Sequence, residues 1–220
     1  MRHHLSLLMQ CIVFTASLSS TPGFSVLFAN EPPQSDKIEE NLIKNGGFEV
    51  PDFDFGVFSI DEGGKEVYWK IRPAKNAKKC TVVLVDETWQ GVSKLSDGPE
   101  VKYNDSDDQT VKIGEFAVLY QAFPTIPDHS YQLTLFYAPN PGIKGATTEG
   151  TIRILGDGVL LSEVLINEEQ ATNKKDIRFK KYVGTFIADS QKATLEIEVG
   201  EIVHGFIVDD VRVVDVSDEK

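Results

Sequence analysis

The sequence predicts an all-β fold, either a β-sandwich or a barrel built from about nine short strands. Apolar and polar residues alternate with a period of two along most of the chain after residue 41, which is typical of strands with one face on a core. Turns that contain Pro or Gly separate these runs, and only 168–176 offers a possible short helical turn. Many short strands with almost no helix favour two packed sheets or a closed barrel.

Four runs show the alternation most clearly. In each of them we expect the following apolar residues to face the core: Val67, Trp69 and Ile71; Phe116, Val118, Tyr120 and Ala122; Tyr131, Leu133, Leu135 and Tyr137; and Ala193, Leu195, Ile197 and Val199. Further strands are expected at 80–86, 151–155, 159–166, 178–187 and 206–216. The stretch Gly156-Asp157-Gly158 predicts a tight hairpin turn between two of these strands.

The composition excludes some classes of function. The chain has 220 residues, a formal net charge of -12 and 41% apolar residues, so it is globular rather than disordered. Binding to nucleic acid needs clustered Lys and Arg that neutralise phosphates, and an acidic chain is also repelled by an anionic membrane surface. We therefore expect neither nucleic acid nor membrane as a partner.

The first 29 residues have the pattern of a secretory signal peptide. A short positive head precedes the apolar run 5–18, which is too short to span a bilayer, and small residues follow it. We expect a flexible leader at 30–40, one β-sandwich domain at 41–216 and a polar tail at 217–220. The mature chain would be secreted, extracellular or periplasmic, with no membrane insertion. Its 21 basic and 34 acidic residues would give a net charge of -13, and its one cysteine, Cys80, could form no internal disulfide.

Asp209 is the sole charged residue on one predicted face of the last strand, which also carries Ile207, Val211 and Val213. A carboxylate buried without a partner would be costly. A hard cation such as calcium would be one partner, because calcium binds carboxylate and carbonyl oxygens. Solvation at the strand entrance, or capping by backbone N–H groups, would be the other solution.

Several segments together resemble a known group of sandwich domains. The opening NLIKNGGFE (41–49), Trp69, the stretch 117–142 and the closing FIVDDVRV (206–213) occur in the order found in jelly-roll modules of the galactose-binding-like superfamily. The chain is most similar to DUF642-type secreted proteins and to family 4/9/16/22-like carbohydrate-binding modules. The resemblance covers about residues 41–216, and it implies an all-β jelly-roll β-sandwich of about nine to ten strands.

The resemblance also implies a function. It points to a secreted, non-catalytic carbohydrate-binding protein that recognises a polysaccharide or another glycan. It implies a structural calcium where the first and last strands meet, held by the Gly47 carbonyl, the Glu49 carboxylate and Asp209. The alternative is an extracellular protein-interaction or structural protein on the same scaffold. Plant DUF642-type members carry several cysteines, so a mature chain with Cys80 alone favours a bacterial branch.

Three residues are candidates for the glycan site. Sugar-binding sandwiches stack exposed aromatic rings on sugars and use amides and carboxylates for the hydroxyl groups. Trp89 lies in a polar loop, with packing over the sheet edge as its alternative. Tyr103 opens the acidic loop 103–108, and Gln121, expected to face away from Tyr120, is either a hydroxyl contact or a solvated strand residue. Trp69, Tyr131 and Tyr137 are expected in the core.

The sequence gives little support for an enzyme. No G-x-S-x-G nucleophile elbow is present, and Cys80 begins a predicted strand, where a thiol is usually inert. His129 lies in a turn and His204 precedes the last strand. We therefore expect no catalytic activity.

Overall fold

The computed structural model describes residues 40–52, 57–60, 68–75, 77–86, 109–140, 147–169, 179–200 and 205–217. The chain divides into two units, 1–37 and 38–220, and every described residue belongs to the second. The predicted signal peptide lies outside the described residues and stays a prediction, as does nearly all of the predicted leader.

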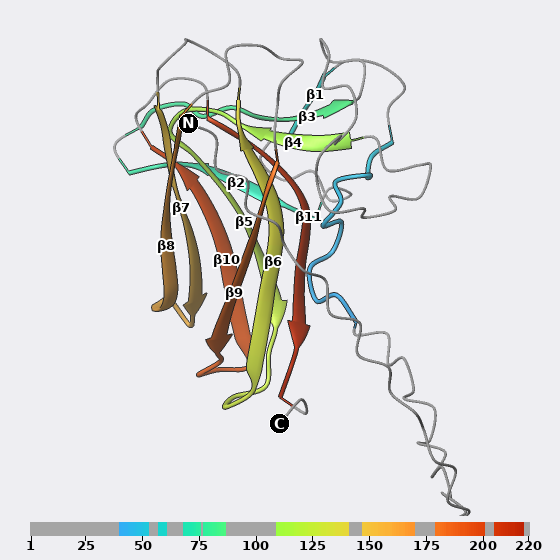
Figure 1. The fold of residues 1–220 in the computed structure, drawn as a ribbon, viewed down its shortest axis with the longest axis vertical. Coiled ribbons are helices and arrows are strands. Elements are labelled where there is room, and N and C mark those ends of the chain that lie inside the picture. Colours follow the sequence, from blue (N-terminus) through green and yellow to red (C-terminus); the bar gives the residue numbers. More distant parts are fainter. Residues whose placement is uncertain are drawn as a thin grey trace, which may run out of the picture. The chain divides into compact units, whose positions relative to one another are not determined.

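Two antiparallel sheets form the second unit (Figure 1). Sheet A has six strands in the order β1 (Val57–Ser59), β3 (Val82–Asp86), β4 (Gln109–Ile113), β11 (Phe206–Asp215), β6 (Ser130–Pro139) and β9 (Lys180–Ile187). Sheet B has five strands in the order β2 (Lys70–Pro73), β5 (Ala117–Pro124), β10 (Lys192–Val199), β7 (Thr147–Gly156) and β8 (Val159–Glu169). From β4 onward the chain alternates between the sheets, and only β7 and β8 follow each other within one sheet. This alternation is the jelly-roll arrangement, so the predicted sandwich is confirmed, with 11 described strands.

The core fills the space between the sheets. Trp69, Leu119, Leu135, Leu195 and Val208 belong to one buried cluster with side chains from both layers. The predicted core positions on β6 and β10 are confirmed: Tyr131, Leu133 and Leu135 are buried, as are the four apolar residues of β10, while Tyr137 packs half-buried against them. Trp69 is 1% exposed and stacks on Phe48 with the ring centroids 5.2 Å apart.

The orientation predicted for β5 was wrong. Ala117, Leu119 and Phe123 belong to the core cluster, so the set led by Val118 and Tyr120 faces outward. Alternation could not decide between the faces, because Val118 and Ala122 make the outward face nearly as apolar as the inward one. The reversal also turns Gln121 inward, where it is 5% exposed.

The face predicted for the last strand is split by a β-bulge between Asp209 and Arg212. Before the bulge, Phe206 and Val208 join the core; after it, Val211 and Val213 do. Ile207 and Asp209 are buried outside that core cluster. Asp210, the extra residue, has a φ of 43°, a left-handed conformation that Asp tolerates better than most residues.

The predicted hairpin is confirmed between β7 and β8. Gly156 pairs with Val159, so Asp157 and Gly158 form a two-residue turn with φ values of 44° and 87°. Positive φ at both positions is the pattern of a type I′ turn, which the Asp-Gly dipeptide favours. Of the possible helical turn at 168–176, Glu168 and Glu169 end β8 and the rest lies outside the described residues. Within the described part of the chain, no helix has the length and apolar character needed to cross a membrane.

Candidate functional site

A row of polar side chains crosses all five strands of sheet B. The strand register pairs Lys70 with Tyr120, Tyr120 with Glu196, Glu196 with Arg153 and Arg153 with Glu163. These five residues alternate with core positions on their strands, so they share the outward face of the sheet. We call this set the charged row. At about 4.8 Å between neighbouring strands, it extends about 19 Å across the sheet.

Ion pairs hold the charged row in place. Arg72, two positions after Lys70, donates from Nη2 to both carboxylate oxygens of Glu196 at 2.9 Å. Arg153 donates from Nε to Glu163 at 2.5 Å and from Nη1 to Glu198. Glu196 is buried as a residue, while the Arg72 side chain is 42% exposed. The carboxylate is therefore sheltered beneath a guanidinium that remains open to solvent.

The electrostatics favour the charged form of Arg153. Burial alone would lower the pKa of Arg153, but hydrogen bonds and the charges of Glu163 and Glu198 outweigh it and raise the pKa above its ordinary value. Guanidinium groups bridged by carboxylates lose little further freedom when a ligand binds, because their geometry is already fixed.

Two tyrosines add aromatic surface beside these charges. Tyr120 is half-buried in the charged row, between Lys70 and Glu196. Tyr68 is 49% exposed just before β2, and the Nζ of Lys44 lies 5.6 Å from its ring centroid. The sequence predicts Tyr120 in the core, and neither tyrosine is among the three residues predicted for the glycan site.

The three residues predicted for the glycan site have different outcomes. Trp89 and Tyr103 lie outside the described residues, so their predicted roles stay predictions. Gln121 does not face solvent: its Oε1 accepts from the Lys44 N–H at 2.7 Å, and its Nε2 donates to the Lys44 carbonyl at 2.9 Å. Its amide therefore fixes the N-terminal segment to sheet B, and we leave it out of the proposed binding surface.

The N-terminal segment 41–46 lies along β11 and forms what we call the terminal clasp. Leu42 donates to Val213 and Val211 donates to Gly46 through backbone bonds of 2.9 Å. The side chain of Asn41 accepts from Val213 at 3.0 Å and donates to Val211 at 3.1 Å. A side chain at Gly46 would collide with the Val211 carbonyl oxygen, so only glycine permits this approach.

Glu49 and Gln109 meet just beyond the terminal clasp. The Gln109 N–H donates to Glu49 Oε1 at 3.2 Å, and Gln109 Nε2 lies 3.3 Å from the Pro51 carbonyl oxygen. β4 and β11 pair as far as Val111 with Val208, and the next step of this register places Thr110 near Asp209. The structure therefore brings two of the predicted calcium ligands, Glu49 and Asp209, to the same end of β4.

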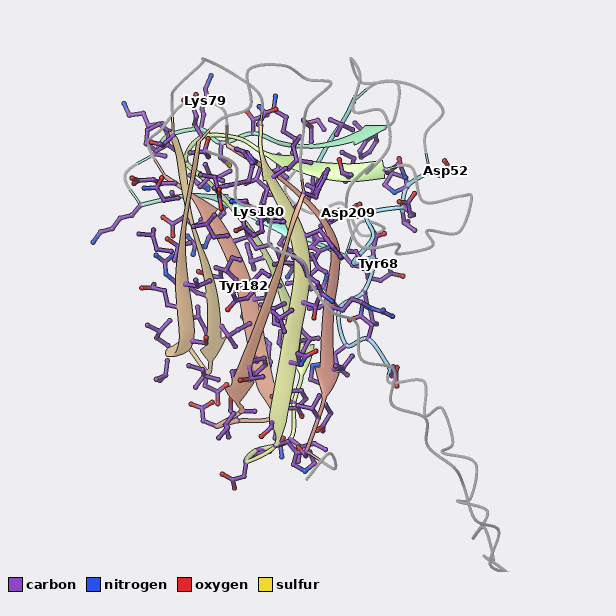
Figure 2. The ribbon with its side chains drawn as sticks, viewed as in Figure 1. Asp52, Tyr68, Lys79, Lys180, Tyr182 and Asp209 are labelled. Carbon is purple, nitrogen blue, oxygen red and sulfur yellow. The ribbon has the colours of Figure 1, made fainter. Side chains whose placement is uncertain are left out.

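Oxygen atoms at this end include two that lack partners. Gln109 Oε1 and Thr110 Oγ1 are buried and form no hydrogen bond among the described residues. Asp209 is 3% exposed, and its Oδ1 accepts from the Asp210 N–H at 2.7 Å (Figure 2, with Asp209 labelled on β11). One expected solution for Asp209, capping by a backbone N–H, is thus present. In the described segments, no three His, Cys, Asp or Glu side chains form a group, so a cation here would need amide and carbonyl oxygens.

Two further polar clusters lie away from the charged row. The Tyr137 hydroxyl donates to Glu168 at 3.1 Å, and Lys180 donates to the same carboxylate at 2.5 Å. Burial, followed by the charge of Glu168, raises the pKa of Tyr137 to about 12. At the β5–β6 turn, His129 Nδ1 lies 2.7 Å from Asp215 Oδ2. Both contacts link strands that are distant in sequence, and neither brings a reactive group to the charged row.

These features define a class: a two-layer antiparallel β-sandwich with clasped termini and a charge-paired, tyrosine-bearing sheet face. No protein-family model matches the sequence, and the search of curated proteins gives no match. Among solved structures, the enzymatically active domain of tailspike protein 4 of bacteriophage CBA120 is similar at 16% identity and a TM-score of 0.50. The match covers 80% of this chain but 21% of the tailspike chain, so this chain spans about a fifth of that protein's length.

Two similar structures are carbohydrate-binding modules. A family 4 module matches at 15% identity and a TM-score of 0.48, covering 79% of this chain and 99% of the module. The module TmCBM61, solved with β-1,4-galactotriose, matches at 16% identity and a TM-score of 0.47, covering 80% and 99%. At these identities the likeness concerns the fold alone. The comparisons give no support for the DUF642-type relationship in particular, which stays a prediction.

Proposed function

We propose that this chain is a secreted, non-catalytic protein that binds a polysaccharide along the charged row of sheet B. The observation that carries the proposal is the unbroken register of Lys70, Tyr120, Glu196, Arg153 and Glu163 across five strands. A linear glycan presents alternating apolar ring faces and hydroxyl groups. In the charged row, the tyrosine ring would pack on the apolar sugar faces. The paired carboxylates and guanidinium groups would form hydrogen bonds with the hydroxyl groups.

A glycan array on the purified protein tests this proposal, followed by titration calorimetry with the best ligand. We expect Tyr120→Ala and Arg72→Gln each to weaken binding about tenfold, the loss of roughly one aromatic or charged contact. Arg212→Gln is the matched control for Arg72→Gln, because Arg212 is exposed on sheet A. Equal loss in Arg212→Gln, or no glycan binding by the wild-type protein, would contradict the proposal.

We also propose that a calcium ion is bound at the end of β4 that begins with Gln109, by Glu49 and Asp209, with the Gly47 carbonyl as a further ligand. The partnerless Oε1 of buried Gln109 supports it, since a buried acceptor without a donor is costly and a hard cation would satisfy it. Gly47 leaves space around its backbone: an added Cβ would meet only Glu49 Cγ, at 3.8 Å. The ion would join the terminal clasp to β4 and would have a structural role.

Thermal melting with calcium and with a chelator tests the site. We expect the wild-type Tm to fall by several degrees when calcium is removed, because ion binding stabilises only the folded state. Glu49→Gln should lower the Tm in calcium and reduce the response to the chelator, whereas Glu163→Gln, on the charged row, should keep the full response. A wild-type Tm that is the same with calcium and with chelator would contradict the proposed calcium site.

A second function is favoured by exposed apolar side chains on two edge strands. Val159, Leu160 and Leu165 on β8, and Val183 and Ile187 on β9, are between 50% and 66% exposed. Edge strands with exposed apolar residues are potential sites for pairing with another chain. Binding to another extracellular protein is therefore the alternative, and it would be indicated if the array shows no glycan and Leu165→Asp abolishes a protein partner found by pull-down.

A further inference from the structure

Basic residues gather in one short stretch of this acidic chain. Positions 70–79 hold five of the 22 Lys and Arg residues, and no Asp or Glu occurs between 70 and 85. The stretch covers β2 and the loop that leads to β3. With a net charge of -12 over the whole chain, such a local excess of positive charge needs an explanation of its own.

Two adjoining hollows lie at this loop, and we call them together the lysine pocket. Their volumes are about 400 Å³ and 340 Å³, and both are lined by Lys79, Cys80 and Thr81. Lys112 of β4 lines the larger hollow and Lys78 lines the smaller one. Figure 2 labels Lys79 at the top of the view. The described lining contains three lysines against one acid, Glu115.

Backbone hydrogen bonds fix the walls of the lysine pocket. Gly114 donates to the Thr81 carbonyl at 2.8 Å, and Ala74 donates to the Phe116 carbonyl at 2.6 Å. An added Cβ at Gly114 would lie 2.8 Å from the Thr81 oxygen, so the two segments approach as closely as glycine allows. A pocket whose walls are already ordered loses little conformational entropy when it binds a ligand.

β2 connects the lysine pocket with the charged row. Lys70 and Arg72 belong to the outward face of sheet B, while Ile71 and Pro73 of the same strand line the smaller hollow. A polysaccharide that follows the charged row toward β2 therefore reaches the edge where the lysines gather. The opposite end of the row, at Glu163 on β8, carries a negative charge and is the less favourable end for an anion.

We propose that the lysine pocket binds an anionic group on the polysaccharide, so that the ligand of this protein is an acidic glycan. The inference rests on the proposed function and names its substrate class. The shared chemistry is a carboxylate or sulfate on a sugar ring; Lys78 and Lys79 contact the anion, and the charged row contacts the neutral part of the chain.

Binding of an oligouronate, its methyl ester and sulfated dextran tests the pocket by calorimetry at low and high salt. The ester removes the charge and keeps the sugar rings, and the dextran arm distinguishes sulfate from carboxylate. We expect the wild-type protein to bind at least one of the two anions about tenfold more tightly than the ester, an advantage that high salt screens away. The double variant Lys78→Gln/Lys79→Gln should lose this advantage and still bind the ester as the wild type does.

Lys181→Gln/Lys192→Gln is the matched control, because it removes the same charge from exposed positions on β9 and β10. Three results would overturn the proposed lysine pocket. The pocket variant could keep the preference for the anion over the ester, the control could lose that preference equally, or the wild type could show no preference. The proposed function is judged separately, by whether Tyr120→Ala weakens binding of the uncharged ester. The protein can therefore bind the uncharged ester through the charged row and still show no preference for the anion, so failure of the lysine pocket is distinguishable from failure of the proposed function.

Discussion

The terminal clasp and the charged row both bring together residues that are far apart in sequence, but they use polar groups differently. In the clasp, neutral amides bond to backbone: Asn41 to β11, and Gln121 to both backbone groups of Lys44. On the charged row, ionised groups pair with one another at the protein surface. Neutral bonds to a buried backbone stabilise the fold, whereas ion pairs with one solvent-exposed partner add little stability and leave that partner available to a ligand.

The largest expected loss of stability comes from a substitution that breaks the terminal clasp. Gly46→Ala places a methyl group against the Val211 carbonyl, so segment 41–46 must move away from β11 and lose its hydrogen bonds. We expect the free energy of unfolding to fall by about 3 kcal/mol, within the range for overpacking with loss of a buried network. The urea midpoint measures it, with Gly47→Ala in chelator as the control, since that position has room for a Cβ. Equal midpoints for the two variants would contradict the steric argument.

The next prediction compares stability and glycan affinity for substitutions of Gln121 and Tyr120, two neighbours on opposite faces of β5. Gln121→Ala leaves the Lys44 N–H and carbonyl without partners and should cost about 2 kcal/mol of stability while glycan affinity stays unchanged. Tyr120→Ala should do the reverse, with a smaller loss of stability and a loss of binding. Urea denaturation and calorimetry on both variants separate the two roles. Loss of affinity in a folded Gln121→Ala protein would return Gln121 to the binding surface.

The sequence was informative about the ends of the domain. The resemblance that rests on NGGFE at 45–49 and the closing FIVDDVRV implies that the first and last segments meet, and they do, along β11. Such motifs carry local constraints, such as glycine where two backbones touch, and local constraints are visible in one sequence. The alternation of Thr194, Glu196 and Glu198 with core residues likewise identified the outward side of β10.

The charged row could not be predicted, because it depends on register between strands that are distant in sequence. Tyr120 meets Glu196 only through the pairing of β5 with β10, and no local pattern sets that register. β4 was missed for a different reason: its five residues do alternate, with Val111 and Ile113 inward, but so short a run is a weak signal. The orientation predicted for β5 was wrong because both of its faces carry apolar residues, so the alternation could not show which face lies on the core.

The smallest expected effect tests whether a charged contact between distant segments behaves differently from the neutral clasp. His129 pairs with Asp215 at the end of β11, and Ser217 donates to the same carboxylate from its N–H at 3.0 Å. Burial would raise the pKa of Asp215, but the hydrogen bonds from His129 and Ser217 outweigh it and lower the pKa to about 2.

A carboxyl with a lowered folded-state pKa stabilises the protein at pH values above its ordinary value of 3.8, and this contribution is lost as the pH falls toward 2. The Asp215 side chain is 35% exposed, so solvent screening limits the effect to about 1 kcal/mol. Urea unfolding between pH 5 and pH 2 should therefore show a steeper loss for the wild type than for Asp215→Asn. Identical slopes would mean that this contact, like the terminal clasp, stabilises the fold through hydrogen bonds without the help of charge.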